Sequence, residues 1–563
     1  MSSRTRICAV ALAAVCLVSL RARAQVSPDR LLNATQEPQN WLTYNGSYSS
    51  QRHSPLTQID VSNAKRLELQ WIYQAAVNGS WQATPLVVDG VMYVTQRPND
   101  VVALEARTGR VFWIYRYNPG NHRACCGANN RGLAILGDTL FMATLDAHLV
   151  AIDAKSGRPL WNTTVADNQE RDYALTLAPL VIKDKVIVGV SGGDRGIRGF
   201  IAAYDASTGK EAWRFNTTAG PGEAGHDTWK PCPPGAPTTP TSPDYCDPNA
   251  WDHGGGAIWV TGSYDPALNL TYWGTGNPGP DWNPAQRPGD NLYTDSVVAQ
   301  NADTGKLAWH FQFTPGDGYD YDSTQIPILA DVERNGVLTK VMLFANRNGF
   351  FYMLSRESGE FLRGTPYIKM NWASGLDRFG RPIQTPQPPG APTYPGNRGG
   401  TSWFSPSYSP RTGLFYVSTW QNFASVYRSA PQAFQGRGGF HGGDFRSPVP
   451  VGVPSTRGPI NSWTEVPASG ALLALDPLTG AEKWRFAMTD VADGGILTTA
   501  SDVLFTATRE GYFYALNART GATLWRATLG GQTIAAPVTY QVDGKQYVSV
   551  ISGQALAVFA LGD

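Results

Sequence analysis

The sequence predicts an all-β chain folded as an eight-bladed β-propeller. A motif of the form A-x-D-x-x-T-G-x-x-x-W recurs along the chain. Its copies lie about 40–50 residues apart, a period typical of propeller blades. Each copy also follows an alternating apolar run, such as "VLFTATREGYFYALNA", and this alternation indicates a β-strand. A tandem of small sandwiches would need linkers between the repeats, and the sequence shows none.

Each copy of the motif joins a turn to a closing strand. The D-x-x-T-G part predicts a tight turn in which Gly adopts a positive φ, and the Trp is a large apolar body that can pack on the neighbouring blade. A weaker copy ends at Leu362, and the stretch around Trp71 resembles a closing strand. The interval from Trp213 to Trp309 has room for two units, which favours eight blades over six or seven. The complete copies end at Trp113, Trp161, Trp213, Trp309, Trp484 and Trp525.

Three long stretches rich in Pro and Gly interrupt the repeats, at 217–256, 376–402 and 430–462. Loops of this length in a regular scaffold are usually functional or disordered. We expect them to build one face of the disc. The repeats account for the rest of the chain, so residues 25–563 are expected to form a single propeller domain.

The first 24 residues predict an export signal. "MSSRTR" is a basic segment, "ICAVALAAVCLVSL" is an apolar one, and Ala22 and Ala24 form a small-residue cleavage site. The apolar segment is short for a membrane span, and Val15 before Cys16 is a poor match to a lipoprotein signal. We therefore expect cleavage after Ala24 and an exported protein without stable membrane insertion.

Four cysteines remain after such cleavage, and an even number in an oxidising compartment predicts disulfides. Three pairings are possible, and we favour local closure, Cys125 with Cys126 and Cys232 with Cys246. Consecutive Cα atoms lie about 3.8 Å apart, whereas disulfides prefer about 4.4–6.8 Å, so a bond between adjacent cysteines must distort the backbone. Strain of this kind tends to persist where function uses it.

Charge and histidine content exclude several classes of function. The chain has 46 basic and 45 acidic residues, a net charge of +1, and no basic tract. Nucleic acid is therefore not expected as a partner. Seven scattered histidines without paired spacing argue against a zinc site. No C-x-x-C-H motif occurs, so we expect no attached c-type haem.

Besides the repeats and the adjacent cysteines, the sequence contains two further distinctive segments, "WGTGNPGPDWN" at 273–283 and "RPGDNLYTDS" at 287–296. Together these features resemble the quinoprotein alcohol dehydrogenases over essentially the whole mature chain. The resemblance implies a periplasmic eight-bladed propeller that binds pyrroloquinoline quinone (PQQ) with a calcium or lanthanide ion. It also implies oxidation of an alcohol to an aldehyde or ketone, with hydride passing to metal-bound PQQ.

The resemblance assigns residues to the quinone. Cys125 and Cys126 match a vicinal disulfide that lies against one face of the ring, and Trp259 matches an indole on the other face. Arg131 matches an arginine that pairs with a cofactor carboxylate, and PQQ has three carboxylates, which suit guanidinium donors. Arg347 matches the arginine over the reactive carbonyl. The other positions expected at the cofactor are Gln82, Thr176, Ser191, Gly192, Gly193, Ser402 and Trp403.

The resemblance also implies a metal site and a base. Hard cations take oxygen ligands, and Asp320 matches the catalytic base of the family. Asp322 lies two residues further on, so in an extended segment it points to the same side; an acidic residue there resembles the lanthanide-using branch. By composition alone, "PGDGYDYDS" would be a polar turn. The expected metal ligands are Asp194, Asn277, Asp320 and Asp322.

Several positions depart from the family pattern. Gln82 and Asp194 each stand where Glu is usual, Ala257 where Thr is frequent, Ser402 where Asn is usual, and Gly316 where His is common. These departures leave open a second hypothesis, a non-catalytic binding or scaffold propeller with a decayed PQQ site. The retained acids, arginines and cysteines favour the enzyme. The lack of a haem motif implies that electrons pass to a separate acceptor, a soluble cytochrome c.

Overall fold

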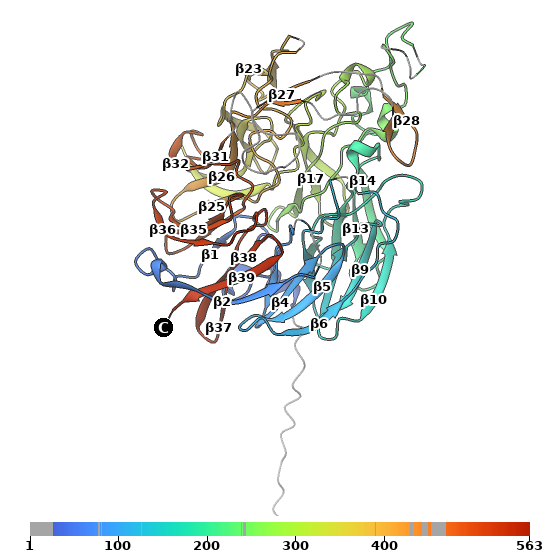
Figure 1. Cartoon of the computed structure of the whole chain (residues 1–563). Coiled ribbons are helices and arrows are strands. Elements are labelled where there is room, and N and C mark those ends of the chain that lie inside the picture. The colour runs from blue at the N-terminus through green and yellow to red at the C-terminus, as the bar shows by residue number, and fades with distance from the viewer. Residues whose placement is uncertain are drawn as a thin grey trace, which may run out of the picture.

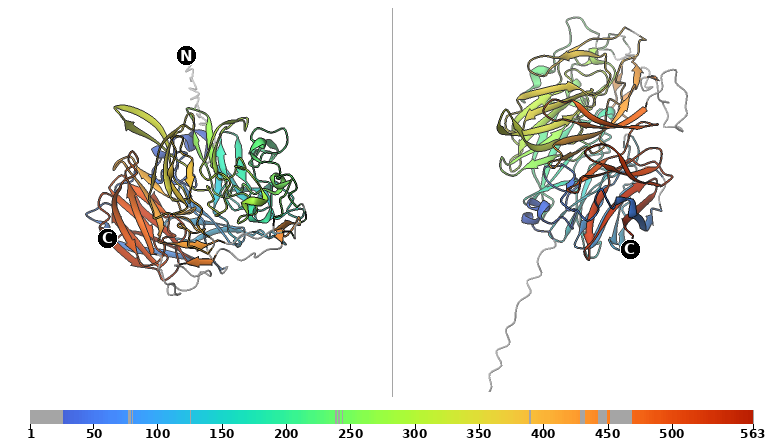
Figure 2. Two further views of the ribbon diagram at one scale, coloured as in Figure 1. Left: turned by 90° about the horizontal axis from the view of Figure 1, so that it is seen from above. Right: turned by 90° about the vertical axis from the view of Figure 1, so that its left-hand side faces the viewer.

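The computed structural model contains eight sheets of four or five strands arranged side by side in a ring (Figures 1 and 2). It describes residues 26–562, except 77–78, 80, 125, 238, 240–241, 243, 389, 428–431, 442–448 and 452–468. The predicted signal segment, residues 1–24, therefore lies outside the described residues. We number the sheets as blades one to eight in chain order, and the prediction of an eight-bladed propeller is confirmed.

The first four blades follow one another without exchange of strands. Blade one holds β3 (Leu86–Val88), β4 (Val91–Gln96), β5 (Asp100–Glu105) and β6 (Val111–Tyr115). Blade two holds β7 (Leu133–Leu136), β8 (Thr139–Ala143), β9 (His148–Asp153) and β10 (Pro159–Thr164). Blade three holds β11 (Leu180–Ile182), β12 (Lys185–Gly189), β13 (Phe200–Asp205) and β14 (Glu211–Asn216). Blade four holds β15 (Ser263–Asp265), β16 (Leu270–Gly274), β17 (Ser296–Asn301) and β18 (Leu307–Gln312).

The next three blades include one with a long internal insertion, since β31 follows β26 in blade six. Blade five holds β19 (Ile328–Arg334), β20 (Val337–Ala345), β21 (Phe350–Ser355) and β22 (Phe361–Pro366). Blade six holds β25 (Ser407–Ser409), β26 (Leu414–Gln421), β31 (Ser469–Leu475) and β32 (Glu482–Met488). Blade seven holds β33 (Ile496–Thr499), β34 (Val503–Ala507), β35 (Tyr512–Asn517) and β36 (Thr523–Thr528), with β1 (His53–Ser54) parallel to β33.

Blade eight closes the ring with strands from both ends of the chain. β2 (Leu67–Gln74) pairs antiparallel with β39, and Leu67 lies opposite Leu561. The other strands of this blade are β37 (Val538–Val542), β38 (Lys545–Ser552) and β39 (Ala555–Leu561). Closure therefore leaves no blade of the ring without two neighbours.

Short helices and three two-stranded sheets lie outside the ring of blades. The sheets are β23 (Ala373–Leu376) with β24 (Pro382–Gln384), β27 (Ala424–Val426) with β30 (Val449–Val451), and β28 (Ala433–Phe434) with β29 (Phe440–His441). The helices are α1 (Pro28–Leu32) and the 3₁₀ turns η1 (Ala34–Gln36), η2 (Ala64–Arg66), η3 (Gly193–Arg195), η4 (His226–Thr228), η5 (Ala250–His253) and η6 (Pro284–Gln286). No helix in the described ranges has the length and apolar character needed to span a membrane.

The repeated Trp joins neighbouring blades, except between blades five and six, where Gly480 contacts Thr365. Trp113, on the last strand of blade one, lies flat against Gly157 in the closing turn of blade two: a Cβ on Gly157 would lie 2.6 Å from the indole. Gly157 also has a φ of +72°, which favours glycine. The indole N–H of Trp113 donates to the carbonyl of Ala154 at 3.2 Å. The motif therefore encodes blade docking, as the sequence predicts.

One detail of the spacing prediction is wrong. The interval between Trp213 and Trp309 contains one blade, blade four, and not two. The extra length is taken up by a long loop after β14, closed by the disulfide Cys232–Cys246, whose Cα atoms lie 5.7 Å apart. The predicted pairing of Cys232 with Cys246 is thus confirmed.

Candidate functional site

Two aspartates and an arginine meet in the segments that follow β18 and β20. Arg347 Nη2 lies 3.0 Å from Asp320 Oδ2, and Arg347 Nη1 lies 2.5 Å from Asp322 Oδ2. Only 6% of the Arg347 side chain is exposed. Asp320 has a φ of +63°, an uncommon backbone conformation for a residue other than glycine. Residues expected to form the catalytic centre are therefore in direct contact.

The backbone around Arg347 fixes its guanidinium. Arg347 Nε and Nη2 both donate to the carbonyl of Asn397, at 3.0 and 2.6 Å. The Arg347 backbone N–H donates to Gln325 Oε1 at 3.3 Å. Gly399 presses on the same side chain, because a Cβ there would lie 2.1 Å from Arg347 Cγ. Since these contacts hold one rotamer, the arginine is preorganised.

Asn277 and Asp281 extend this group from blade four. The backbone N–H of Asn277 donates to Asp322 Oδ1 at 3.1 Å, and its side-chain amide donates to Asp281 Oδ1 at 2.9 Å. The side chain of Trp259 opposes the rise in the pKa of Asp322 that burial causes. Asp281 was not expected at the site. Its position four residues after Asn277, inside the conspicuous segment "WGTGNPGPDWN", is the signal that could have identified it.

The carboxylates raise one another's pKa. Burial raises the pKa of Asp320 well above its ordinary value; Arg347 opposes this, while Asp322, Asp194 and Asp281 raise it further. Burial likewise raises the pKa of Asp322. Excess negative charge of this kind is what a bound cation would stabilise. Within the described ranges no three His, Cys, Asp or Glu side chains already form a cation site, and Arg347 pairs with both loop aspartates.

A second layer of buried polar residues lies behind the first, and sequence reasoning missed it. Asp317 accepts the backbone N–H groups of Tyr319 and Tyr321 at 2.8 and 2.7 Å, which shapes the loop that carries Asp320. Burial raises the pKa of Asp317 to about 6. Asp295 is fully buried, and neither of its carboxylate oxygens has a hydrogen-bond partner among the described residues.

Arg131 forms a separate cationic group on the other side of Trp259. Its guanidinium lies 4.9 Å from the Trp259 ring and 4.6 Å from the Trp403 ring. Nη1 donates to Thr176 Oγ1 at 3.0 Å and to the Trp259 carbonyl at 3.1 Å. Nε has no partner, and no described carboxylate pairs with this arginine. Burial lowers its pKa to about 10, so the site holds a desolvated cation that an anionic ligand would neutralise.

The segment Ser191–Gly193, which is predicted to lie along the edge of the quinone, packs against Ala174 and Ala257. Ser191 Oγ donates to the Ala174 carbonyl at 2.8 Å, so its hydroxyl is already engaged. Gly192 has a φ of +117°, and a Cβ on Gly193 would lie 3.3 Å from the Ala257 Cβ. Ser191–Gly193 and Ala257 therefore form one tightly packed wall.

The structure describes three of the remaining predicted cofactor residues, Gln82, Ser402 and Cys126, but not Cys125. Gln82 is buried with an unpartnered Oε1 within the described part of the chain, and Ser402 is partly buried next to Trp403. Cys126 is exposed and has a φ of +63°. Cys125 lies outside the described residues, so its bond to Cys126 stays a prediction.

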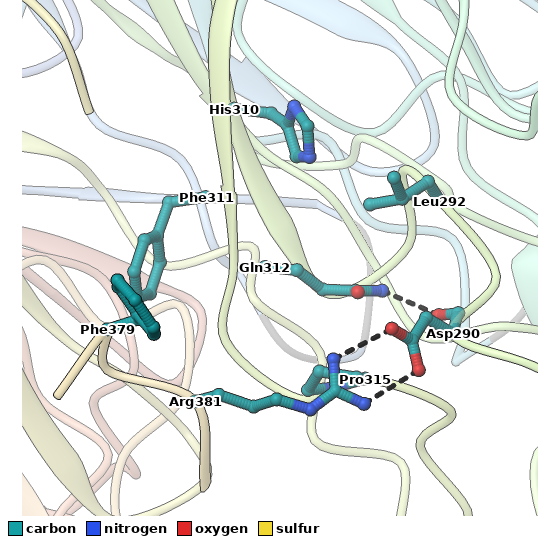
Figure 3. Close-up of a pocket in the computed structure, with 8 residues that line it drawn as sticks. All are labelled: Asp290, Leu292, His310, Phe311, Gln312, Pro315, Phe379 and Arg381. Atoms are coloured by element: carbon teal, nitrogen blue, oxygen red, sulfur yellow. Dashed lines mark hydrogen bonds and ion pairs between the residues drawn. The ribbon is translucent and has the colours of Figure 1, made fainter. Parts of the chain in front are cut away.

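A surface pocket of about 250 Å³ lies away from these residues, between β18 and the β23–β24 hairpin (Figure 3). Arg381 and Asp290 bridge it with two hydrogen bonds of 2.7 and 2.8 Å. The other residues that line the pocket are Leu292, His310, Phe311, Gln312, Pro315 and Phe379. None of them is a predicted site residue.

Comparison with known proteins matches this geometry to a family. Residues 41–371 match the model described as glucose/ethanol/alcohol dehydrogenase, β-propeller domain, and residues 468–561 match one described as outer membrane protein assembly factor BamB. The quinoprotein alcohol dehydrogenase PedH of Pseudomonas putida is 38% identical, over 96% of this chain and 91% of its own length.

Two solved structures share the fold over nearly the whole chain. The quinohemoprotein alcohol dehydrogenase ADHIIG of Pseudomonas putida has a TM-score of 0.84 at 34% identity, covering 96% of this chain and 83% of its own. A europium-containing methanol dehydrogenase has a TM-score of 0.79 at 32% identity, covering 95% and 100%. With an eight-bladed ring, a family match over more than half its length and a relative 38% identical over 96% of it, this chain belongs to the PQQ-dependent alcohol dehydrogenases.

Proposed function

We propose that this member of the family oxidises an alcohol in the periplasm with PQQ and a calcium or lanthanide ion, and that Asp320 is its general base. The observation that carries the proposal is Arg131, a buried guanidinium with no carboxylate partner among the described residues. A polyanionic quinone would supply that partner. The flanking rings of Trp259 and Trp403 offer flat surfaces beside it.

The proposed metal ligands are Asp194, Asn277, Asp320 and Asp322. Their chemistry fits a hard cation, because three carboxylates and an amide supply oxygen donors. Asp281, which touches Asn277, adds a further negative charge nearby. This accumulation of acids favours a trivalent lanthanide over calcium. When bound, PQQ and its metal supply a hydride acceptor and a Lewis acid.

The chain's own residues have distinct parts in the reaction. Asp320 accepts the hydroxyl proton of the alcohol at its carboxylate. Arg347 lies 3.0 Å from that carboxylate and favours its ionised form, and its positive charge would also stabilise negative charge that develops on the quinone oxygen. Trp259 and Arg131 orient the ring, and burial of the site excludes bulk water.

Electrons are proposed to leave on a separate soluble cytochrome c. Export is proposed from residues 1–24, with cleavage after Ala24. A scaffold with a decayed site would have no need for a desolvated arginine beside two indoles, so the geometry favours the enzyme over that alternative.

Reconstitution tests the proposal. Purified protein is titrated with PQQ in the presence of calcium or of a light lanthanide, and binding is followed by quinone absorbance. Alcohol-dependent dye reduction should appear with at least one metal, and more strongly with the lanthanide. Failure to bind PQQ with every metal tested would refute the proposed function.

A further inference from the structure

The β28–β29 hairpin, residues 432–441, leaves blade six but lies against the loops of blades two to four (Figure 1). It therefore reaches across the face of the ring to the segments that carry Asp194 and Asn277. Its contacts with both segments are direct, and they involve two aromatic side chains, Phe434 and Phe440.

Phe434 packs on the turn that contains Asp194. A Cβ on Gly196, two residues after Asp194, would lie 2.6 Å from the Phe434 ring. Gly439 meets the same turn, because a Cβ there would lie 2.8 Å from Arg195 Cα. The hairpin backbone is anchored close by, since Gly438 N–H donates to an Asp172 carboxylate oxygen at 3.0 Å. The hairpin thus contacts the turn that contains Asp194 through both its backbone and the Phe434 ring.

Phe440 packs on the segment that contains Asn277. It is 2% exposed, and a Cβ on Gly279, two residues after Asn277, would lie 2.9 Å from its ring. Gln286, further along the segment, exchanges two hydrogen bonds with the backbone of Gln432: its Oε1 accepts the N–H at 3.1 Å, and its Nε2 donates to the carbonyl. The hairpin is therefore attached to this segment at two points.

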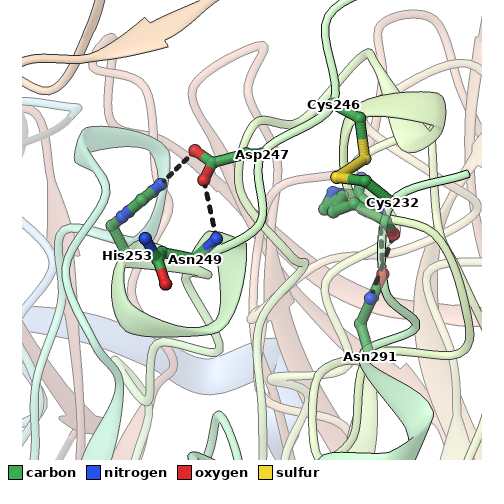
Figure 4. Close-up of a disulfide and its surroundings, with 7 residues drawn as sticks. Cys232, Cys246, Asp247, Asn249, His253 and Asn291 are labelled. Carbon is green, nitrogen blue, oxygen red and sulfur yellow. Dashed lines mark hydrogen bonds and ion pairs between the residues drawn. A yellow bond between two sulfur atoms is a disulfide. The ribbon is translucent and has the colours of Figure 1, made fainter. Parts of the chain in front are cut away.

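A buried histidine, hydrogen-bonded to an aspartate, packs against both aromatic rings. The ring of His253 stacks on Phe434 with centroids 4.2 Å apart, and lies edge-on to Phe440 at 5.8 Å. His253 Nε2 lies 2.8 Å from Asp247 Oδ2, next to the disulfide at Cys246 (Figure 4). The segment that directly follows the disulfide, residues 247–253, thus packs against the hairpin.

We propose that Phe434 and Phe440 are positioning residues for the metal site. By packing on Gly196 and Gly279, they fix the separation between Asp194 on blade three and Asn277 on blade four. This inference rests on the proposed function for the identity of those two ligands. It differs from that function in assigning metal affinity to side chains that do not touch the metal.

The test uses F434A and F440A in the full-length protein, with F379A as the control because Phe379 is an exposed phenylalanine (65%) on another hairpin. Affinity for Eu³⁺ in the presence of PQQ is measured by luminescence titration. Loss of support around metal ligands typically costs 10–100-fold in affinity. We expect at least about a tenfold loss in F434A and F440A, and no loss in F379A.

The reciprocal change tests the same contact from the other side. G279A should weaken Eu³⁺ binding, because its new Cβ meets the Phe440 ring, and adding F440L should restore part of the affinity. If F440A does not fold, these milder variants still test whether the contact between Gly279 and Phe440 supports Eu³⁺ binding. An additive double variant would contradict direct contact between the two positions.

Amide hydrogen exchange of metal-free protein separates this inference from the proposed function. Exchange at 193–196 and 276–281 should be faster in F434A and F440A than in wild type and F379A. Wild type that binds no metal would refute the proposed function, while the exchange comparison would still decide the positioning role. Unchanged exchange at both segments, or unchanged Eu³⁺ affinity in variants of a metal-binding wild type, would overturn the inference.

Discussion

Blade docking through the Trp–Gly contact makes a quantitative prediction for G157A. Gly157 has a φ of +72°, and an added Cβ would lie 2.6 Å from the Trp113 indole. A left-handed conformation costs a residue with a Cβ about 1–2 kcal/mol, and overpacking a dense contact costs about 1–3 kcal/mol more. The free energy of unfolding should therefore fall by about 2–5 kcal/mol.

The same blade offers a matched control in G137A. Gly137 has a φ of +62°, but nothing lies within 4 Å of its added Cβ. This variant should show the backbone cost alone, about 1–2 kcal/mol. Urea unfolding followed by Trp fluorescence compares the two, and the shift in midpoint should be clearly larger for G157A. Equal midpoints for the two variants would refute steric docking of the indole on the glycine.

Four further predictions concern the site and the scaffold. D320N should retain PQQ but lose turnover, because an amide cannot accept the alcohol proton; stopped-flow reduction of the bound quinone checks this. R131M should weaken PQQ binding by about 10–100-fold, the value of a charged hydrogen bond of about 1.5–3 kcal/mol, in an absorbance titration. Replacing Cys232 and Cys246 by Ser should make the enclosed loop more susceptible to a nonspecific protease, since closing a loop of about 15 residues is worth about 3 kcal/mol. Burial lowers the pKa of His53 to about 4, below the unfolded value of about 6.5, so stability should be lost as pH falls from about 6.5 to 4, and H53N should flatten the pH profile of urea midpoints.

The architecture was predictable because it is encoded locally. Each D-x-x-T-G turn and its Trp lie within a dozen residues, so the blades are visible one at a time in the sequence. The error between Trp213 and Trp309 has a physical origin: an insertion rich in Pro and Gly occupies as much chain as a blade, and spacing alone does not distinguish them. Because consecutive blades are neighbours in the ring, the Trp of one blade meets the turn of the next blade in the chain.

The candidate site was only partly predictable. Asp320, Asp322, Asn277 and Arg347 came from family resemblance, and the structure brings them together. Acids such as Asp281 lie in loops rich in Gly and Pro, where composition makes them look like ordinary turn residues. The contacts of the 432–441 hairpin with the segments of Asp194 and Asn277 join residues at least 146 positions apart, and no local pattern signals such pairings.

Closure of the ring by β2 and β39 also governs how the molecule can assemble. Leu67 finds its partner Leu561 only once the chain has been made as far as β39. Until then the backbone N–H and C=O groups along β2 are unsatisfied on the side that β39 later covers, which makes β2 a potential site of intermolecular strand pairing. A nascent or C-terminally truncated chain would therefore be aggregation-prone, and final folding must be a late, nearly all-or-none event.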